Sequence, residues 1–206
     1  MELKTRIFRP IALLVVLAAA LPAIAVESAA DILSAMTRKM ASAPAVEATF
    51  TVTGADRPVE GSIIMAGAKF AMTTPVISVW YDGVDQWTML ESSGEVNITN
   101  PTRDELMQCN PFAVISSYAG HYTARRLADS NGRRRVELTP TTPSDLAKVV
   151  IMVGADNWPA AVSLVFDDGR SIAATVNTIS STRGKPMSAF RFDPQRYPAV
   201  AIVDLR

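Results

Sequence analysis

The chain consists largely of short segments in which apolar and polar side chains alternate, with tight turns between them. In residues 46–52 the apolar side chains fall at every second position, which is the pattern of a strand with one buried face. Dipeptides such as Asp82-Gly83 and Asn131-Gly132 are typical of turns between antiparallel strands. The pattern predicts strands over residues 46–52, 59–65, 69–73, 76–81, 86–90, 94–99, 122–128, 133–139, 146–153, 160–167, 170–179 and 189–192. So many short strands favour a mainly β, α+β fold with one large, curved antiparallel sheet.

Before the first strand, residues 28–40 are predicted to form an amphipathic helix. Ser28 is placed to cap it, with Asp31 three positions on. Ile32, Leu33, Met36 and Met40 fall at helical spacing and make one apolar stripe. This stripe needs an apolar surface to pack against.

A second helical segment is predicted in the middle of the chain, over residues 101–118. Thr102 and Glu105 have the spacing of a capping box. Pro111 is expected to divide the segment into two short helices, because its ring cannot fit inside a continuous one. The apolar side chains of this segment include Leu106, Met107, Phe112 and Ile115. We expect both helical segments to cover the concave face or the open mouth of the sheet.

Residues 1–25 have the features of a cleavable secretory signal. Lys4, Arg6 and Arg9 precede an apolar run over 11–20 that is too short for a confident bilayer span. Ala23-Ile24-Ala25 supplies the small-x-small site of signal peptidase, so cleavage is expected after Ala25. We expect residues 26–206 to form a single exported domain without a permanent membrane anchor. The alternative is a signal that stays uncleaved and anchors the chain.

Composition argues against several functional classes. Without Lys4, Arg6 and Arg9 on one side and Glu2 on the other, the 20 basic and 20 acidic residues of the chain become 17 and 19 in the mature part. This balance gives no electrostatic basis for binding nucleic acid. Because the chain has one cysteine, it forms no internal disulfide.

The sequence offers little material for catalysis. Cys109 and His121 are the only residues of their types, and no reactive-cysteine motif surrounds them as a nucleophile–base pair. Without clustered ligands, no metal site and no cofactor are predicted. We therefore expect a binding protein rather than an enzyme.

Some strands carry large apolar side chains on both faces, whereas one sheet face normally meets water. Residues 77–81 and 86–90 are the clearest examples. The mature part also has eight of the nine methionines, a residue type that recurs on adaptable binding surfaces. The pattern fits either an ordinary core or a surface for an apolar ligand.

The order of these elements resembles the outer-membrane lipoprotein carrier family of LolA-like periplasmic chaperones. Residues 61–65 (GSIIM) followed by 67–70 (GAKF) look like the family's glycine, strand, turn and Lys-Phe pattern. Residues 79–83 (VWYDG) with Gln86-Trp87 resemble its Asp-Gly turn between strands. Residues 190–193 (FRFD) and 200–204 (VAIVD) are similar to its closing F-x-F and apolar-aspartate tail. Carriers of the best-known branch of the family have an arginine directly after the Lys-Phe pair that bonds to the lid, and here that position is Ala71.

The resemblance implies an incomplete antiparallel β-barrel whose hydrophobic cavity is lidded by helices. It also implies a function: the carrier accepts acylated lipoproteins from an inner-membrane transporter, shields their acyl chains across the periplasm and delivers them to an outer-membrane acceptor. Acceptors of this fold are lipid-anchored, and no cysteine stands near the cleavage site. The missing cysteine therefore favours a periplasmic carrier over an acceptor, and we expect this carrier to be a monomer.

On this resemblance, two groups of residues are predicted to bind the ligand. The cavity lining comprises Phe50, Ile63, Met65, Phe70, Met72, Trp80, Trp87, Met89, Val96 and Ile98. The lid comprises Leu33, Met36, Met40, Leu106, Met107, Phe112 and Ile115. Because Ala71 cannot supply the arginine bond, we expect apolar contact to hold the lid shut.

Two alternatives to the carrier belong to other classes. One is a related periplasmic barrel that senses lipid or lipoprotein in envelope stress regulation. The other is an exported hydrolase, which the single histidine and single cysteine make a poor candidate.

Overall fold

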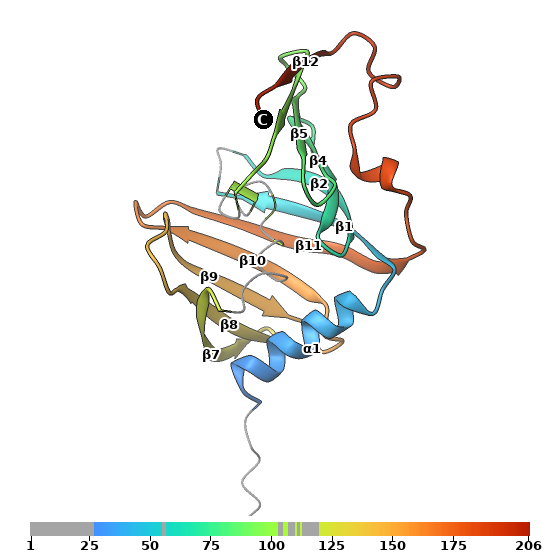
Figure 1. Ribbon diagram of the computed structural model, residues 1–206. Coiled ribbons are helices and arrows are strands. Elements are labelled where there is room, and N and C mark those ends of the chain that lie inside the picture. The colour runs from blue at the N-terminus through green and yellow to red at the C-terminus, as the bar shows by residue number, and fades with distance from the viewer. Residues whose placement is uncertain (1–26, 55–56, 103–104, 107–109, 111, 113–119) are drawn as a thin grey trace, which may run out of the picture.

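The computed structural model describes residues 27–54, 57–102, 105–106, 110, 112 and 120–206 (Figure 1). These residues form one α-helix, one 3₁₀ helix and a single sheet of twelve strands. The elements are α1 (Ala29–Ala41), β1 (Ala45–Thr53), β2 (Val59–Ala66), β3 (Lys69–Thr73), β4 (Ile77–Tyr81), β5 (Gln86–Leu90), β6 (Glu95–Thr99), β7 (Tyr122–Ser130), β8 (Arg133–Pro140), β9 (Leu146–Val153), β10 (Pro159–Phe166), β11 (Ser171–Thr182), η1 (Met187–Phe190) and β12 (Ala201–Asp204).

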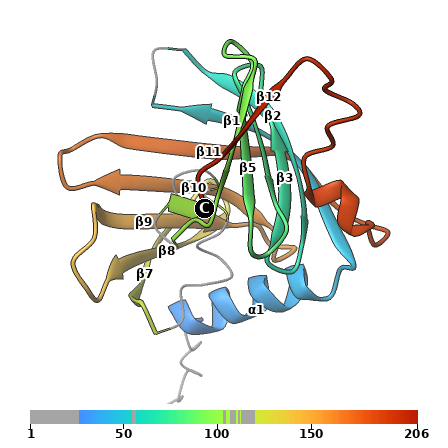
Figure 2. The ribbon, with the colours of Figure 1, turned by 45° about the horizontal axis from the view of Figure 1, so that its top comes forward.

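The sheet is curved and open. Its strand order is β12-β6-β5-β4-β3-β2-β1-β11-β10-β9-β8-β7, so β12 and β7 stand at opposite edges (Figures 1 and 2). Strands β1–β6 and β7–β11 each pair in chain order, and the two groups are joined by the pairing of β1 with β11, which brings Ala45 opposite Thr182. The predicted fold class, a curved sheet that forms an incomplete barrel with a helix, is confirmed.

The end of the chain differs from the sequence prediction. Residues 189–192 were predicted as a strand, but the structure places a 3₁₀ turn over Met187–Phe190 instead. The last strand is β12, which pairs with β6 in parallel, whereas every other strand pair is antiparallel. Phe190 and Phe192 alternate like strand residues because both rings are buried: the turn that carries Phe190 contacts β3, and Phe192 packs against Met89 and Val96.

The predicted first helix is confirmed, including its cap. The Ser28 hydroxyl accepts a hydrogen bond from the Asp31 backbone N–H, and the Asp31 carboxylate accepts one from the Ser28 backbone N–H. Ile32, Leu33 and Met36 are fully buried, and the helix packs against β7 and β8 (Figure 2). This defines the inner face of the sheet as the face that α1 covers.

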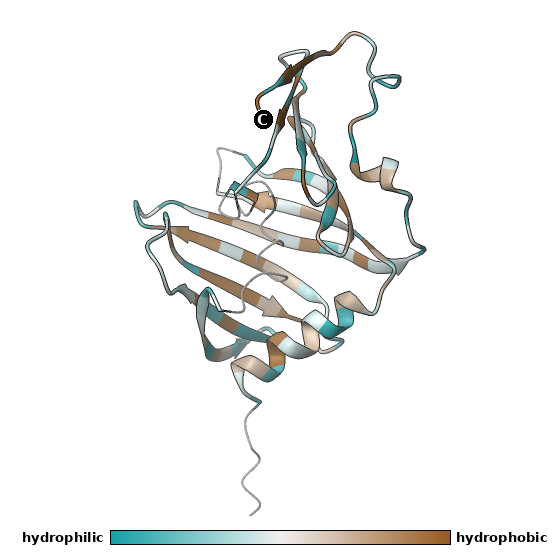
Figure 3. Cartoon of the chain, viewed as in Figure 1, coloured by the Kyte–Doolittle hydropathy of each residue, from teal (hydrophilic) through white to brown (hydrophobic). Residues whose placement is uncertain are grey.

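Most of the core lies on the inner face. We call it the main cluster: it combines α1 with inward side chains of β1–β4 and β8–β11. Burial along β9 follows the strand period, with Val149, Ile151 and Val153 buried and Val150 and Met152 half-buried, although all five side chains are apolar (Figure 3). On the outer face of β1 and β11, Thr49 hydrogen-bonds Thr178 and Thr51 hydrogen-bonds Asn177, as expected for a water-facing surface.

None of the helices within the described residues is long and apolar enough to cross a membrane.

Candidate functional site

The floor of the candidate site is formed by five apolar residues on neighbouring strands. The register pairs Ala48 with Ile63, Ile63 with Met72 and Met65 with Phe70, so these side chains share the inner face. The predicted lining residues Phe50, Ile63, Met65, Phe70 and Met72 are all buried in the main cluster. The structure therefore brings this half of the predicted lining together.

The Phe50 ring comes close to the next strand, which has a glycine opposite it. Gly61 is the register partner of Phe50. A Cβ atom at Gly61 would lie 2.6 Å from Phe50 Cζ and 2.9 Å from Phe50 Cε2. The glycine of the 61–65 motif therefore has a physical role that the sequence pattern alone did not show: it makes room for an aromatic ring on the floor of the site.

The segment after β6 covers this floor. Thr102 and Glu105 form the predicted capping box, in which Glu105 Oε2 accepts hydrogen bonds from the Thr102 backbone N–H and hydroxyl. These bonds lower the pKa of Glu105. Leu106 packs against the main cluster, and Phe112 is 4% exposed and meets Phe50 edge to face, with ring centroids 6.2 Å apart.

The remaining predicted lid residues divide between α1 and the undescribed part of the chain. Leu33 and Met36 are buried in the main cluster, and Met40 packs against it. Met107 and Ile115 lie outside the described residues, as do Pro111 and Cys109. Ten of the predicted residues, from both groups, thus meet in one cluster.

Ala71 does not face this cluster. It pairs with Ile64 and Trp80, whereas its neighbours Phe70 and Met72 point inward. In this register a side chain at position 71 belongs to the outer face. Among the described residues, no ion pair joins 101–112 to the sheet, and the contacts of Phe112 and Leu106 with it are apolar.

The other five lining residues lie on the opposite face, so placing them in the same cavity is wrong. Val79 faces inward, so the next residue, Trp80, faces outward. The register pairs Trp80 with Trp87 and Met89 with Val96, which places these side chains on the outer face as well. Met89, Val96 and Phe192 form a second cluster, against which Trp80, Trp87, Tyr197 and Val200 pack. Ile98 is the register partner of Trp87 on that face and belongs to neither cluster.

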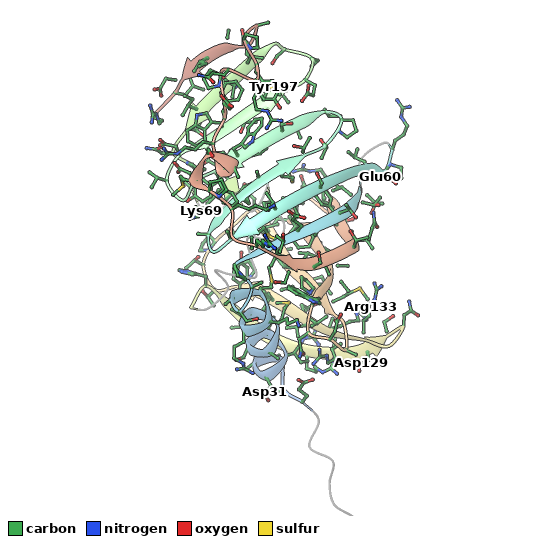
Figure 4. The ribbon with its side chains drawn as sticks, turned by 90° about the vertical axis from the view of Figure 1, so that its right-hand side faces the viewer. Asp31, Glu60, Lys69, Asp129, Arg133 and Tyr197 are labelled. Atoms are coloured by element: carbon green, nitrogen blue, oxygen red, sulfur yellow. The ribbon has the colours of Figure 1, made fainter. Side chains whose placement is uncertain are left out.

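The second cluster is covered by the C-terminal segment, residues 190–200. Trp80 meets the rings of Phe192 and Tyr197 edge to face at 5.6 and 5.9 Å, and those two rings stack at 5.4 Å. Figure 4 shows Tyr197 over the strands at this end of the sheet. The apolar residues on both faces of β4 therefore reflect two cores, one on each side.

An ion pair fastens this segment at the turn between β4 and β5. Arg191 donates to Asp82 at 2.7 Å through both Nε and Nη2, and the Asp82 side chain is 4% exposed. Burial raises the pKa of Asp82, but the backbone N–H groups of Asp85 and Val84 and the Arg191 guanidinium outweigh it, so the pKa is lowered below 3.8. This ion pair thus connects the Asp-Gly turn at Asp82 with the F-x-F motif that contains Arg191.

A polar pocket lies beyond β4 on the inner face. Its volume is about 540 Å³. Gln86 and Thr88 of β5 and Asn97 and Thr99 of β6 line it, in the register pairs Gln86–Thr99 and Thr88–Asn97. Asn100, Pro101 and Glu105 at the start of the covering segment complete it, together with Leu205 and Arg206. The inner face therefore changes from apolar to polar between β4 and β5.

Arg206, at the rim of this pocket, is already paired with two carboxylates. Arg206 donates to Asp204 at 2.6 Å and to Asp85 at 2.8 Å. The Arg206 hydrogen bonds hold the pKa of Asp204 at about 2. With Glu105, the described part of the rim has three carboxylates and one guanidinium.

The described residues include no group of three or more His, Cys, Asp or Glu side chains placed to hold a metal ion.

The class of fold is an open, curved antiparallel sheet, an incomplete β-barrel whose apolar inner face is covered by a helix and by Leu106 and Phe112. The family follows from the sequence match. The model described as "Outer membrane lipoprotein carrier protein LolA" matches residues 21–139, and the chain belongs to this family.

Solved structures align with the chain at low sequence identity. An uncharacterized conserved protein from Thermus thermophilus aligns with a TM-score of 0.59 and 10% identity, over 85% of this chain and 98% of that chain. A DUF1329 family protein from Desulfovibrio piger aligns at 0.49 and 8%, over 81% and 98%. The MucA/MucB complex of Pseudomonas aeruginosa aligns at 0.43 and 12%, over 81% and 62%. At 10% identity the first likeness shows the fold alone, and no curated protein matches the chain.

Proposed function

We propose that this protein is a periplasmic carrier that binds the acyl chains of lipoproteins on the inner face of its sheet and moves them from the inner to the outer membrane. Family membership supports this proposal. The observation that carries it is the main cluster, in which Phe50, Ile63 and Met72 form an apolar floor under Phe112. An inner-membrane transporter and an outer-membrane acceptor are the partners that such a function requires, and no cofactor or covalent chemistry is needed.

An acyl chain can displace the covering segment on energetic grounds. Full burial of a side chain such as Phe112 or Leu106 stabilises by about 1.5–3 kcal/mol. Each buried methylene of an acyl chain contributes about 0.8 kcal/mol, so a chain of roughly fourteen methylenes contributes about 11 kcal/mol. A single chain therefore exceeds what the two side chains lose when they leave the floor.

The covering segment is better suited to open than α1. Ile32, Leu33 and Met36 of α1 are fully buried. From the covering segment, by contrast, Phe112 is buried and Leu106 is half-buried. Among the described residues, opening α1 would expose more apolar surface than separating Leu106 and Phe112 from the floor, so we assign the movement to the part of the chain that carries these two residues and the fixed wall to α1.

Release of lipoproteins from inner-membrane vesicles tests the function. Wild type should release them into the soluble fraction, and Phe112→Asp should release less, because a carboxylate against Phe50 keeps the segment from closing over the floor. Val84→Asp is the matched control, since Val84 is 69% exposed in the turn between β4 and β5. Circular dichroism checks that the sheet stays folded. Equal release by wild type and a folded Phe112→Asp protein would contradict the assignment, and no release by wild type would contradict the carrier function.

A further inference from the structure

We propose that the polar pocket beside β5 and β6 binds the uncharged peptide backbone next to the acylated residue of the cargo. This inference rests on the proposed carrier function. It assigns the polar part of the cargo to a site separate from the main cluster, and it names the chemistry of that site.

The pocket adjoins the apolar floor. In the β4–β5 register, Val79 stands opposite Thr88 and Tyr81 stands opposite Gln86. Val79 is fully buried in the main cluster and Tyr81 packs against it, whereas Thr88 and Gln86 line the pocket. Directly opposite residues in a sheet have Cβ atoms about 4.5–5.5 Å apart. A molecule with an apolar tail and a polar end can therefore span both surfaces across one strand boundary.

The covering segment is shared by the two surfaces as well. Glu105 lines the polar pocket, and the next residue, Leu106, packs against the main cluster. The two surfaces therefore meet at Glu105 and Leu106 as well as along the boundary between β4 and β5.

The side chains on the pocket floor match a peptide backbone. Gln86, Thr88, Asn97 and Thr99 offer amide and hydroxyl groups, which both donate and accept hydrogen bonds. Within the described residues, the side chains of Asn97 and Thr99 hydrogen-bond no other protein group, so they are available to a ligand. Backbone N–H and C=O groups require such partners when they leave water.

The charge of the rim distinguishes a peptide from an anionic headgroup. Asp85, Asp204 and Glu105 outnumber Arg206, and Arg206 is already paired with two of these carboxylates. Of the lining residues that the structure describes, none offers a phosphate an unpaired cation, and the carboxylates at the rim would repel it. A neutral peptide backbone is not repelled by these carboxylates and needs no cation. The pocket volume of about 540 Å³ lies within the usual range of ligand pockets.

Three probes separate the possible ligands: palmitate, a synthetic triacylated Cys-Ser-Ser peptide amide, and phosphatidylglycerol in micelles. Binding is measured by displacement of a fluorescent fatty acid from the full mature protein. The test variant is Asn97→Ala/Thr99→Val, which removes hydrogen-bonding groups from the pocket. The control is Asn177→Ala/Thr175→Val, which makes the same chemical changes on the exposed outer face of β11. Thermal unfolding of both variants checks the fold.

We expect the test variant to weaken lipopeptide binding about tenfold, as two lost hydrogen bonds predict, and to leave palmitate binding unchanged. The control should match wild type with every probe. An unchanged lipopeptide affinity, an equal loss for palmitate, or a loss confined to phosphatidylglycerol would each overturn the proposal while leaving the carrier function standing. If wild type binds neither palmitate nor lipopeptide, the carrier function itself fails and this inference with it.

Discussion

Substituting Gly61 by alanine should destabilise the protein, although the same change in an ordinary strand is expected to stabilise it. Gly→Ala at a compatible site gains about 0.4–1 kcal/mol, chiefly by restricting the unfolded chain. Here the new Cβ would lie 2.6 Å from Phe50 Cζ and 2.9 Å from the Thr73 carbonyl oxygen. Phe50 is 2% exposed and already meets Phe112, so its ring has little room to move. Overpacking of this kind costs about 1–3 kcal/mol, and we expect a net loss of about 2 kcal/mol.

A double-mutant cycle identifies the cause of this loss. Phe50→Leu removes the ring atoms that the new methyl group would strike, so Gly61→Ala should cost less in that background, by about 1 kcal/mol or more. Part of the cost should remain, because the Thr73 oxygen is backbone and cannot leave. Gly184→Ala is the matched control, since its nearest neighbour would be Pro44 Cβ at an ordinary 3.8 Å.

Urea unfolding followed by circular dichroism gives the free energy of unfolding for each variant. The reasoning is refuted if Gly61→Ala is as stable as wild type, or if its cost is the same with and without the Phe50 ring.

Three further outcomes are expected. Asp82→Asn should lower the free energy of unfolding by about 1–3 kcal/mol at neutral pH, because it weakens the bond to Arg191. The pKa of Asp82 is lowered below 3.8 in the folded protein, so this stability is present above that value and is lost as the pH falls through the folded pKa. Urea unfolding should therefore show the stabilities of wild type and variant converging in acid rather than diverging. In variants that keep one tryptophan each, an acyl ligand should change the fluorescence of Trp158, which packs against the main cluster, and leave Trp80 and Trp87 unchanged; the reverse response would place the ligand on the outer face. Dialysis against a chelator should leave the melting temperature unchanged, and stoichiometric zinc or calcium in the dialysed protein, with stability lost on chelation, would show that the sequence prediction of no metal is wrong.

Structural features that depend only on residues close together in the chain could be predicted from the sequence. The cap of α1 needs only Ser28 and Asp31, and the hairpin turns need only dipeptides such as Asn131-Gly132. The inner face of β1–β3 followed from the period of the strands, because these strands each bury one apolar side.

The face of β5 and β6 could not be predicted in the same way. Period 2 shows that Trp87 and Met89 share a side, yet it does not show which side faces α1. That choice depends on Phe192 and Tyr197, about a hundred positions later, which cover the outer face. The sequence offered one indication: β4 is apolar on both faces, as a strand between two cores must be.

The end of the chain shows the same limit. Phe190 and Phe192 alternate like strand residues, but the sheet face on which they pack is formed by distant residues such as Trp80. The parallel pairing of β12 with β6 joins residues 201–204 to 95–98, and no local pattern encodes such a pairing.

Site-specific photo-crosslinking tests the central claim, that acyl chains bind on the inner face. A photoreactive amino acid at Met72 lies on the floor of the main cluster, and the same amino acid at Met89 lies in the second cluster on the other side of the sheet. Both positions are buried in β-strands, so they form a matched pair. With a lipoprotein that carries radiolabelled palmitate, the account predicts a labelled adduct from position 72 and none from position 89. A labelled adduct from position 89 alone would contradict it.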